Sequence, residues 1–124
     1  LEELQNDRDL VYVHLEAPDE CGHQGNVNDK IRSIELIDSE VLGTLLNGLN
    51  SMDDYRIMVL PDHPTPVAIK THCPDPVPFF IYDSRRTEVL SRDRIYSEKD
   101  ARNTGLFIRE GHTLMSMLLE SRAI

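Results

Sequence analysis

Residues 26–60 read NVNDKIRSIELIDSEVLGTLLNGLNSMDDYRIMVL, a long amphipathic segment followed by a short apolar run. Its apolar residues recur every three or four positions, as one face of an α-helix requires. Asn26 is suited to cap the start of this helix, and Gly48 or Asn50 marks its end. The apolar stripe consists of Val27, Ile31, Ile34, Ile37, Val41 and Leu45, widened by Leu42, Leu46 and Leu49. The sequence therefore predicts one long helix that leads into a strand at 56–60.

Short apolar runs on both sides of this helix predict β-strands. Residues 10–15 (LVYVHL) precede the helix and read as a buried strand, and residues 56–60 (RIMVL) follow it. A strand–helix–strand unit of this kind places its two strands parallel in one sheet. Further elements are predicted in four places: strands at 66–70 and 78–82, a helical turn at 97–102 and a helix at 111–121.

These elements predict an α/β fold with a mostly parallel sheet flanked by helices. The predicted strands are apolar on both faces, which normally requires helices on both sides of the sheet, yet only one long and one shorter helix are available. We therefore expect residues 1–124 to be one segment of a larger α/β domain, and the start at Leu1 rather than Met favours the same view. The bare sheet face favours a homodimer.

The composition excludes several classes of protein. With 124 residues, 14.2 kDa and 40% hydrophobic residues, the chain suits one domain or part of one. Its net charge of −9 argues against binding to nucleic acid or to an anionic membrane. No apolar run approaches the roughly 18 residues of a membrane span. The two cysteines, Cys21 and Cys73, form no disulfide framework, so we expect a reducing cytoplasm.

Three groups of metal-ligand side chains follow the predicted strands. Asp19 and His23 follow the first strand, Asp62 and His63 the second, and His72 the third. Asp19 and His23 share a face if residues 17–24 are helical, and Gly22 permits a turn if they form a loop. Because ligands of parallel sheets bind at the carboxyl ends of the strands, these groups are expected to converge.

Two carboxylates and three imidazoles suit Mn²⁺ or Zn²⁺, and five ligands indicate two ions. Each group alone is a weak signal, since Asp and His in loops are usually solvated or cap helices. Other polar residues have ordinary explanations: His14 is a core or supporting histidine, and His112 is structural. Glu16 and Glu20 are either solvated or assist the site. Cys21 and Cys73 are inert neighbours or soft donors that recruit Zn²⁺. Arg85 and Arg86 fit a solvated connector better than a phosphate site.

The segments HLEAPDECGHQGN (14–26), YRIMVLPDHPTPVAIKTHCPDPVPF (55–79) and EGHTLM (110–115) together resemble one family. They are similar to the C-terminal part of cofactor-independent phosphoglycerate mutases of the archaeal-type branch, which belong to the alkaline phosphatase superfamily. The resemblance extends from about residue 9 to about residue 119. It implies a cytoplasmic glycolytic enzyme that interconverts 3- and 2-phosphoglycerate through a phosphoserine.

The resemblance also implies roles for the candidate ligands. Asp19, His23 and His72 would hold one divalent ion, commonly Mn²⁺, with Zn²⁺, Mg²⁺ or Co²⁺ as alternatives. Asp62 and His63 would contribute to a second ion. Prolines on either side would then stiffen the loops that aim these ligands. The one departure from the family pattern near a ligand is Cys73, where a hydroxyl residue is expected.

The family's nucleophilic serine has no counterpart in this chain, because Ser33, Ser39 and Ser51 do not match its motif. The substrate-binding insertion domain is absent too, so the chain alone is predicted to be inactive. Two other interpretations stay open: another metal-dependent phosphotransferase or phosphatase of the phosphopentomutase kind, and a non-catalytic metal-binding interaction module.

Overall fold

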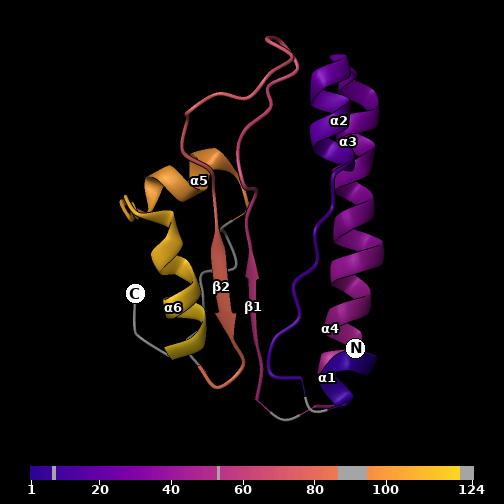
Figure 1. Ribbon diagram of the computed structural model, residues 1–124, viewed down its shortest axis with the longest axis vertical. Coiled ribbons are helices and arrows are strands. Elements are labelled where there is room, and N and C mark those ends of the chain that lie inside the picture. The colour runs from indigo at the N-terminus through magenta and orange to yellow at the C-terminus, as the bar shows by residue number, and fades with distance from the viewer. Residues whose placement is uncertain (7, 53, 87–94, 121–124) are drawn as a thin grey trace. The chain divides into compact units, whose positions relative to one another are not determined.

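The computed structural model describes residues 1–6, 8–52, 54–86 and 95–120, which form two compact units. The first unit comprises Leu1–Asp53 and His63–Asp75, and the second comprises Asp54–Asp62 and Pro76–Ile124. The chain therefore leaves the first unit, returns to it for thirteen residues, and leaves it again (Figure 1). This short return, His63–Asp75, carries two of the three candidate histidine ligands.

The first unit is helical. After the short helix α1 (Glu2–Gln5), helix α2 (Ala17–Gln24) begins with a proline in its first turn and ends at Gly25. Gly25 has φ 72°, a left-handed conformation that glycine adopts without steric cost and that commonly terminates helices. The chain then reverses into α3 (Val27–Leu36), which packs against α2 (Figure 1).

The predicted long helix is confirmed. The Asn26 side chain accepts a hydrogen bond from the backbone N–H of Asp29 at 3.2 Å, as an N-cap should. Helix α3 continues through a π-helical segment, Ile37–Leu42, into α4 (Gly43–Leu49) without leaving helical backbone angles. The π-helical segment was not predicted. Hydrogen bonds in a π-helix span five residues instead of four. The apolar side chains of α4 therefore point in a different direction from those of α3 than they would in one regular α-helix.

The second unit contains the sheet. Strand β1 (Arg56–Val59) pairs with β2 (Phe80–Asp83) in an antiparallel register that opposes Arg56 to Asp83 and Val59 to Phe80. Helix α5 (Glu98–Asn103) and a 3₁₀ turn (Gly111–Thr113) leading into α6 (Leu114–Glu120) complete the unit, and α6 packs against β1. Both helices agree with those predicted at 97–102 and 111–121.

The prediction of a mostly parallel sheet is wrong for the residues that the structure describes. A parallel pair needs a long crossover, usually a helix, and residues 60–79 between β1 and β2 contain none. The predicted strand at 66–70 is a turn in which Ile69 and Lys70 both donate to the Pro66 carbonyl. Residues 10–15 pair with no strand, and Tyr12 among them is 75% exposed rather than buried.

The cores of the two units are small. Within the described ranges, the buried apolar side chains are Leu49 in the first unit, and Pro78 and Leu114 in the second. The apolar stripe of α3 is half-exposed, with Ile31 at 53% and Ile34 at 51%. None of the helices in the described part of the chain combines the length and the apolar character that crossing a membrane requires.

Candidate metal centre

Helix α2 places Asp19 and His23 on one face. The sequence left open whether these residues lie in a loop or a helix, and the structure shows the helix, with the two side chains four residues apart. His23 Nε2 lies 3.4 Å from Asp19 Oδ2. Pro18 in the first turn is compatible with this helix because the N–H groups there need no intrahelical partner.

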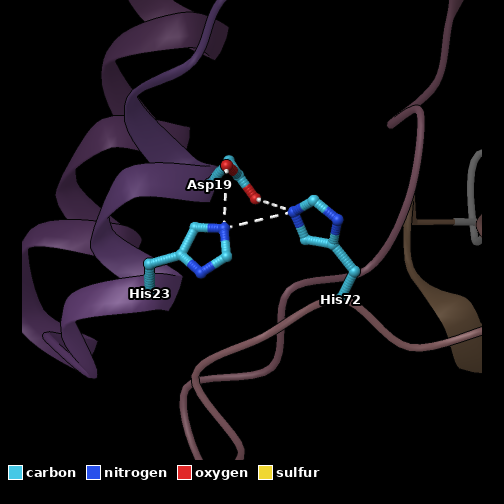
Figure 2. Close-up of side chains that lie close together, drawn as sticks. All are labelled: Asp19, His23 and His72. Carbon is cyan, nitrogen blue, oxygen red and sulfur yellow. Dashed lines mark hydrogen bonds and ion pairs between the residues drawn. The ribbon is translucent and has the colours of Figure 1, made fainter.

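His72 meets this pair from the His63–Asp75 segment (Figure 2). Its Nε2 lies 3.1 Å from His23 Nε2 and 3.5 Å from Asp19 Oδ1. One ligand atom from each of the three residues lies within 4.8 Å of the other two. The structure thus brings together, from positions up to 53 residues apart, two imidazole nitrogens and a carboxylate oxygen, which is a donor set that suits Mn²⁺ or Zn²⁺.

The orientation of the His23 ring is set by the backbone of the same segment. Its Nδ1 lies 3.0 Å from the carbonyl oxygen of Lys70. A carbonyl oxygen only accepts, so Nδ1 donates to it, and in the neutral imidazole Nε2 is then the nitrogen without a proton. Histidines that bind metals commonly donate their second ring N–H in this way. Lys70 presents its carbonyl from a left-handed backbone conformation with φ 55°.

The close approach of α2 to the His63–Asp75 segment depends on Gly22. A Cβ atom at this position would lie 2.4 Å from the carbonyl oxygen of Thr65 and 3.0 Å from Lys30 Nζ. The Lys30 ammonium, which projects from α3, donates to that same Thr65 carbonyl at 2.7 Å. Gly22 on α2 therefore leaves room for the Thr65 backbone, and Lys30 on α3 binds its carbonyl oxygen.

The Asp19 carboxylate is held in its ionised form. The Thr65 hydroxyl donates a hydrogen bond to Asp19 Oδ1, and this bond is the largest cause of a lowered pKa for the Asp19 carboxyl. Partial burial opposes the shift, and the neighbouring histidines His23, His72 and His63 add to the lowering. An ionised carboxylate is the form that binds a divalent cation.

His63 lies beside the three-residue cluster. Its ring packs on that of His72 with a centroid separation of 3.6 Å, and its Nδ1 lies 3.9 Å from Asp19 Oδ1 and 3.3 Å from Thr65 Oγ1. Asp62, the predicted companion of His63, belongs to the other compact unit. Of the five predicted ligands, four thus share one unit.

The residues given ordinary explanations lie mostly at the surface. Of the two interpretations of His14, the one that places it in the core is wrong, because its side chain is 49% exposed and lies 3.8 Å from Glu16. His112 is exposed beside Glu110. Arg85 is engaged with Asp83 through hydrogen bonds of 2.7 and 2.9 Å. Cys73 donates to Asp75, and both cysteines are free thiols.

Three supporting residues were missed by the sequence analysis: Thr65, Lys30 and Lys70. Thr65 had a signal, because it stands between Pro64 and Pro66, which restrict the backbone on either side of it. Lys30 and Lys70 had none, since their contacts join segments 35 and 47 residues apart.

The family model described as the metalloenzyme superfamily matches residues 1–121. No solved structure matches the chain.

Several curated proteins are similar over most of the chain. It is 47% identical over 112 residues to a 2,3-bisphosphoglycerate-independent phosphoglycerate mutase of Methanothrix thermoacetophila, covering 90% of this chain and 28% of the relative. A probable enzyme of the same name from Geobacter sulfurreducens is 43% identical over 112 residues, with the same two coverages of 90% and 28%. That of Methanosarcina barkeri is 39% identical over 121 residues, covering 97% of the chain and 30% of the relative.

The chain spans less than a third of the length of these relatives. The family model, by contrast, covers nearly the whole chain, including every residue of the Asp19, His23 and His72 cluster. The chain therefore belongs to the metalloenzyme superfamily.

Proposed function

We propose that this chain is the metal-binding C-terminal portion of a cofactor-independent phosphoglycerate mutase. The whole protein would interconvert 3- and 2-phosphoglycerate in the cytoplasm through a phosphoserine intermediate. The serine and the substrate-binding domain would come from parts of the protein outside these 124 residues. This chain by itself would bind metal without turning over substrate.

The convergence of Asp19, His23 and His72 is the observation that carries the proposal. These ligands come from a helix and from a distant loop, so only a folded chain assembles them. Two of the three are separately supported: Asp19 by Thr65, and His23 by the Lys70 carbonyl. Mutases similar along the same residues supply the reaction class.

The residues present fit a divalent cation. When bound, such an ion stabilises negative charge on phosphoryl oxygens and favours the ionised form of an attacking hydroxyl. The chain's own contribution is to hold one carboxylate and two imidazoles with a ligand atom of each within 4.8 Å of the others, at little cost in reorganisation. Mn²⁺ is the proposed ion, and Asp62 and His63 are proposed ligands of a second.

Calorimetric titration of the metal-stripped chain with Mn²⁺ and Zn²⁺ tests the site. We expect about one ion per chain, and loss of binding in His72→Ala, because two ligands alone do not make a closed site. His112→Ala is the matched control, since that side chain is 79% exposed and outside the cluster. Binding that survives in His72→Ala would contradict the assigned site.

A mutase assay on the whole protein tests the reaction. We expect conversion of 3- to 2-phosphoglycerate that requires Mn²⁺ and is lost in Asp19→Asn. A metal-binding protein that leaves phosphoglycerate unchanged but transfers phosphate on another ester would instead support the phosphopentomutase-like alternative.

A further inference from the structure

Thr65 is a buried polar residue that is not itself in the predicted ligand set. It is 4% exposed, whereas the side chains of the ligands around it are between 32% and 51% exposed. A threonine hydroxyl has one proton to donate and two lone pairs to accept with. Burial means that this hydroxyl must find its partners within the protein.

Among the residues that the structure describes, two side chains lie within reach of this hydroxyl. It donates to Asp19 Oδ1, and its Oγ1 lies 3.3 Å from His63 Nδ1. An ionised carboxylate can only accept, so the single hydroxyl proton points to Asp19. The contact with His63 must then run in the other direction, from Nδ1–H to the lone pair of Oγ1.

The directions of these two hydrogen bonds determine which oxygen of Asp19 and which nitrogen of His63 remain available. With Oδ1 of Asp19 held by the hydroxyl, Oδ2 is the oxygen that faces His23, at 3.4 Å from its Nε2. With Nδ1 of His63 donating, Nε2 is the nitrogen without a proton when that ring is neutral. The Lys70 carbonyl produces the same tautomer in His23.

We propose that Thr65 is a positioning residue that couples the two halves of the metal centre through one hydroxyl. It orients Asp19 for one ion and selects the Nδ1–H tautomer of His63 for the other. The inference rests on the proposed metal-binding function. The backbone of Thr65 is itself held, since Lys30 donates to its carbonyl at 2.7 Å and the absence of a side chain at Gly22 leaves room for it.

Thr65→Val and Thr65→Ser separate the hydroxyl from the packing. Valine keeps the shape and removes the hydroxyl, whereas serine keeps the hydroxyl and removes a methyl group. We expect Thr65→Val to weaken Mn²⁺ binding by about 10–100-fold, the usual effect of removing a group that supports a ligand. Thr65→Ser should bind close to wild type. Thr71→Val is the matched control, because Thr71 lies exposed in the same segment.

The tautomer of His63 provides a readout that does not depend on metal. Ring-nitrogen NMR spectra of the metal-free protein should show Nδ1–H for His63 in wild type and Thr65→Ser, and a mixture of tautomers in Thr65→Val. Equal loss of affinity in the valine and serine variants would overturn the proposal in favour of packing. An unchanged tautomer and affinity in Thr65→Val would overturn it outright.

The two proposals fail in different ways. A wild-type protein that binds no Mn²⁺ contradicts the proposed function, while the tautomer of His63 still reports on Thr65. A protein that binds Mn²⁺ but shows no effect of Thr65→Val contradicts the role of Thr65 alone.

Discussion

His23 Nδ1 donates a hydrogen bond of 3.0 Å to the carbonyl oxygen of Lys70, whose backbone has φ 55°. The conformation that aims a candidate metal ligand therefore depends on a left-handed residue that is not glycine. Left-handed backbone is unfavourable for most residues and especially for those branched at Cβ. The predicted site consequently relies on the local backbone of one turn as well as on its ligands.

Replacing Lys70 tests this dependence. Lys70→Val should weaken Mn²⁺ binding and destabilise the chain, because a residue branched at Cβ adopts a left-handed conformation less readily than lysine does. Lys70→Gly removes the same side chain but adopts positive φ readily, so it should bind Mn²⁺ like wild type. Calorimetry and urea unfolding measure both effects. Equal behaviour of the two variants would show that the backbone conformation is unimportant.

Gly22→Ala should separate α2 from the His63–Asp75 segment. The added Cβ would lie 2.4 Å from the Thr65 carbonyl oxygen and 2.9 Å from Thr65 Cγ2, so backbone must move. We expect a loss of roughly 1–3 kcal/mol in the free energy of unfolding, typical of overpacking, and weaker Mn²⁺ binding.

Gly43→Ala is the control for that substitution. Its Cβ would meet only the Asp38 carbonyl oxygen at an ordinary 3.5 Å, in a helix. Alanine there should stabilise the chain by about 0.5–1 kcal/mol and leave metal affinity unchanged. A Gly22→Ala variant that behaves like Gly43→Ala in chemical denaturation would refute the close approach.

Asp83 anchors the second unit electrostatically. Its carboxylate accepts from Arg56 at 2.7 Å and from Arg85, and Arg56 also donates to the Leu118 carbonyl of α6. Asp83→Asn should lower the free energy of unfolding at neutral pH by roughly 1.5–3 kcal/mol, the range for a hydrogen bond to a charged group. Urea unfolding measures it, with the exposed Asp75→Asn as control.

The Asp83 carboxylate should also make the stability of the chain depend on pH in acid. Hydrogen bonds from Arg85 hold the pKa of Asp83 far below its usual value. Its stabilising contribution is therefore complete above the pKa of about 4 in the unfolded chain, and is lost as the pH falls toward the folded pKa. Asp83→Asn should flatten the fall in stability below about pH 4. If Asp83→Asn keeps the wild-type dependence of stability on pH, the loss of stability in acid comes from other carboxylates.

Tyr96 should make the stability of the chain fall at alkaline pH. Burial, and then the negative charge of Glu98, raise the pKa of the Tyr96 hydroxyl to about 12. The hydroxyl donates to the Pro78 carbonyl at 3.0 Å, and the ring meets Phe80 edge-on. A raised pKa means that stability is complete below the unfolded value of about 10 and declines as the pH rises through the folded value.

Ultraviolet absorbance of phenolate measures this titration directly. Tyr96→Phe should remove one tyrosine that ionises near pH 12 in the folded chain, and should lessen the loss of stability at alkaline pH. Tyr12→Phe, at a residue that is 75% exposed, should leave that component in place. Ionisation of all folded tyrosines near pH 10 would contradict the packing of Tyr96.

The sequence predicted well wherever the signal is local. The helix that begins after Asn26, the turn at 97–102 and the final helix follow from periodicity and capping within a few residues, and all three are confirmed. The sheet was predicted wrongly because apolar runs indicate strands without saying what they pair with. Residues 10–15 are apolar yet unpaired, and Pro66 turns the 66–70 run back on itself.

By itself, the sequence determined the helices, the family resemblance and the candidate ligands, because residue type and short spacing carry that information. Only the tertiary structure decided that Asp19 and His23 lie on a helix and that His72 meets them from a segment 49 residues farther along. It alone revealed Thr65, Lys30 and the Lys70 carbonyl. The physical reason is that a hydrogen bond between distant segments depends on how the backbone brings them together, which leaves no periodic trace in the sequence.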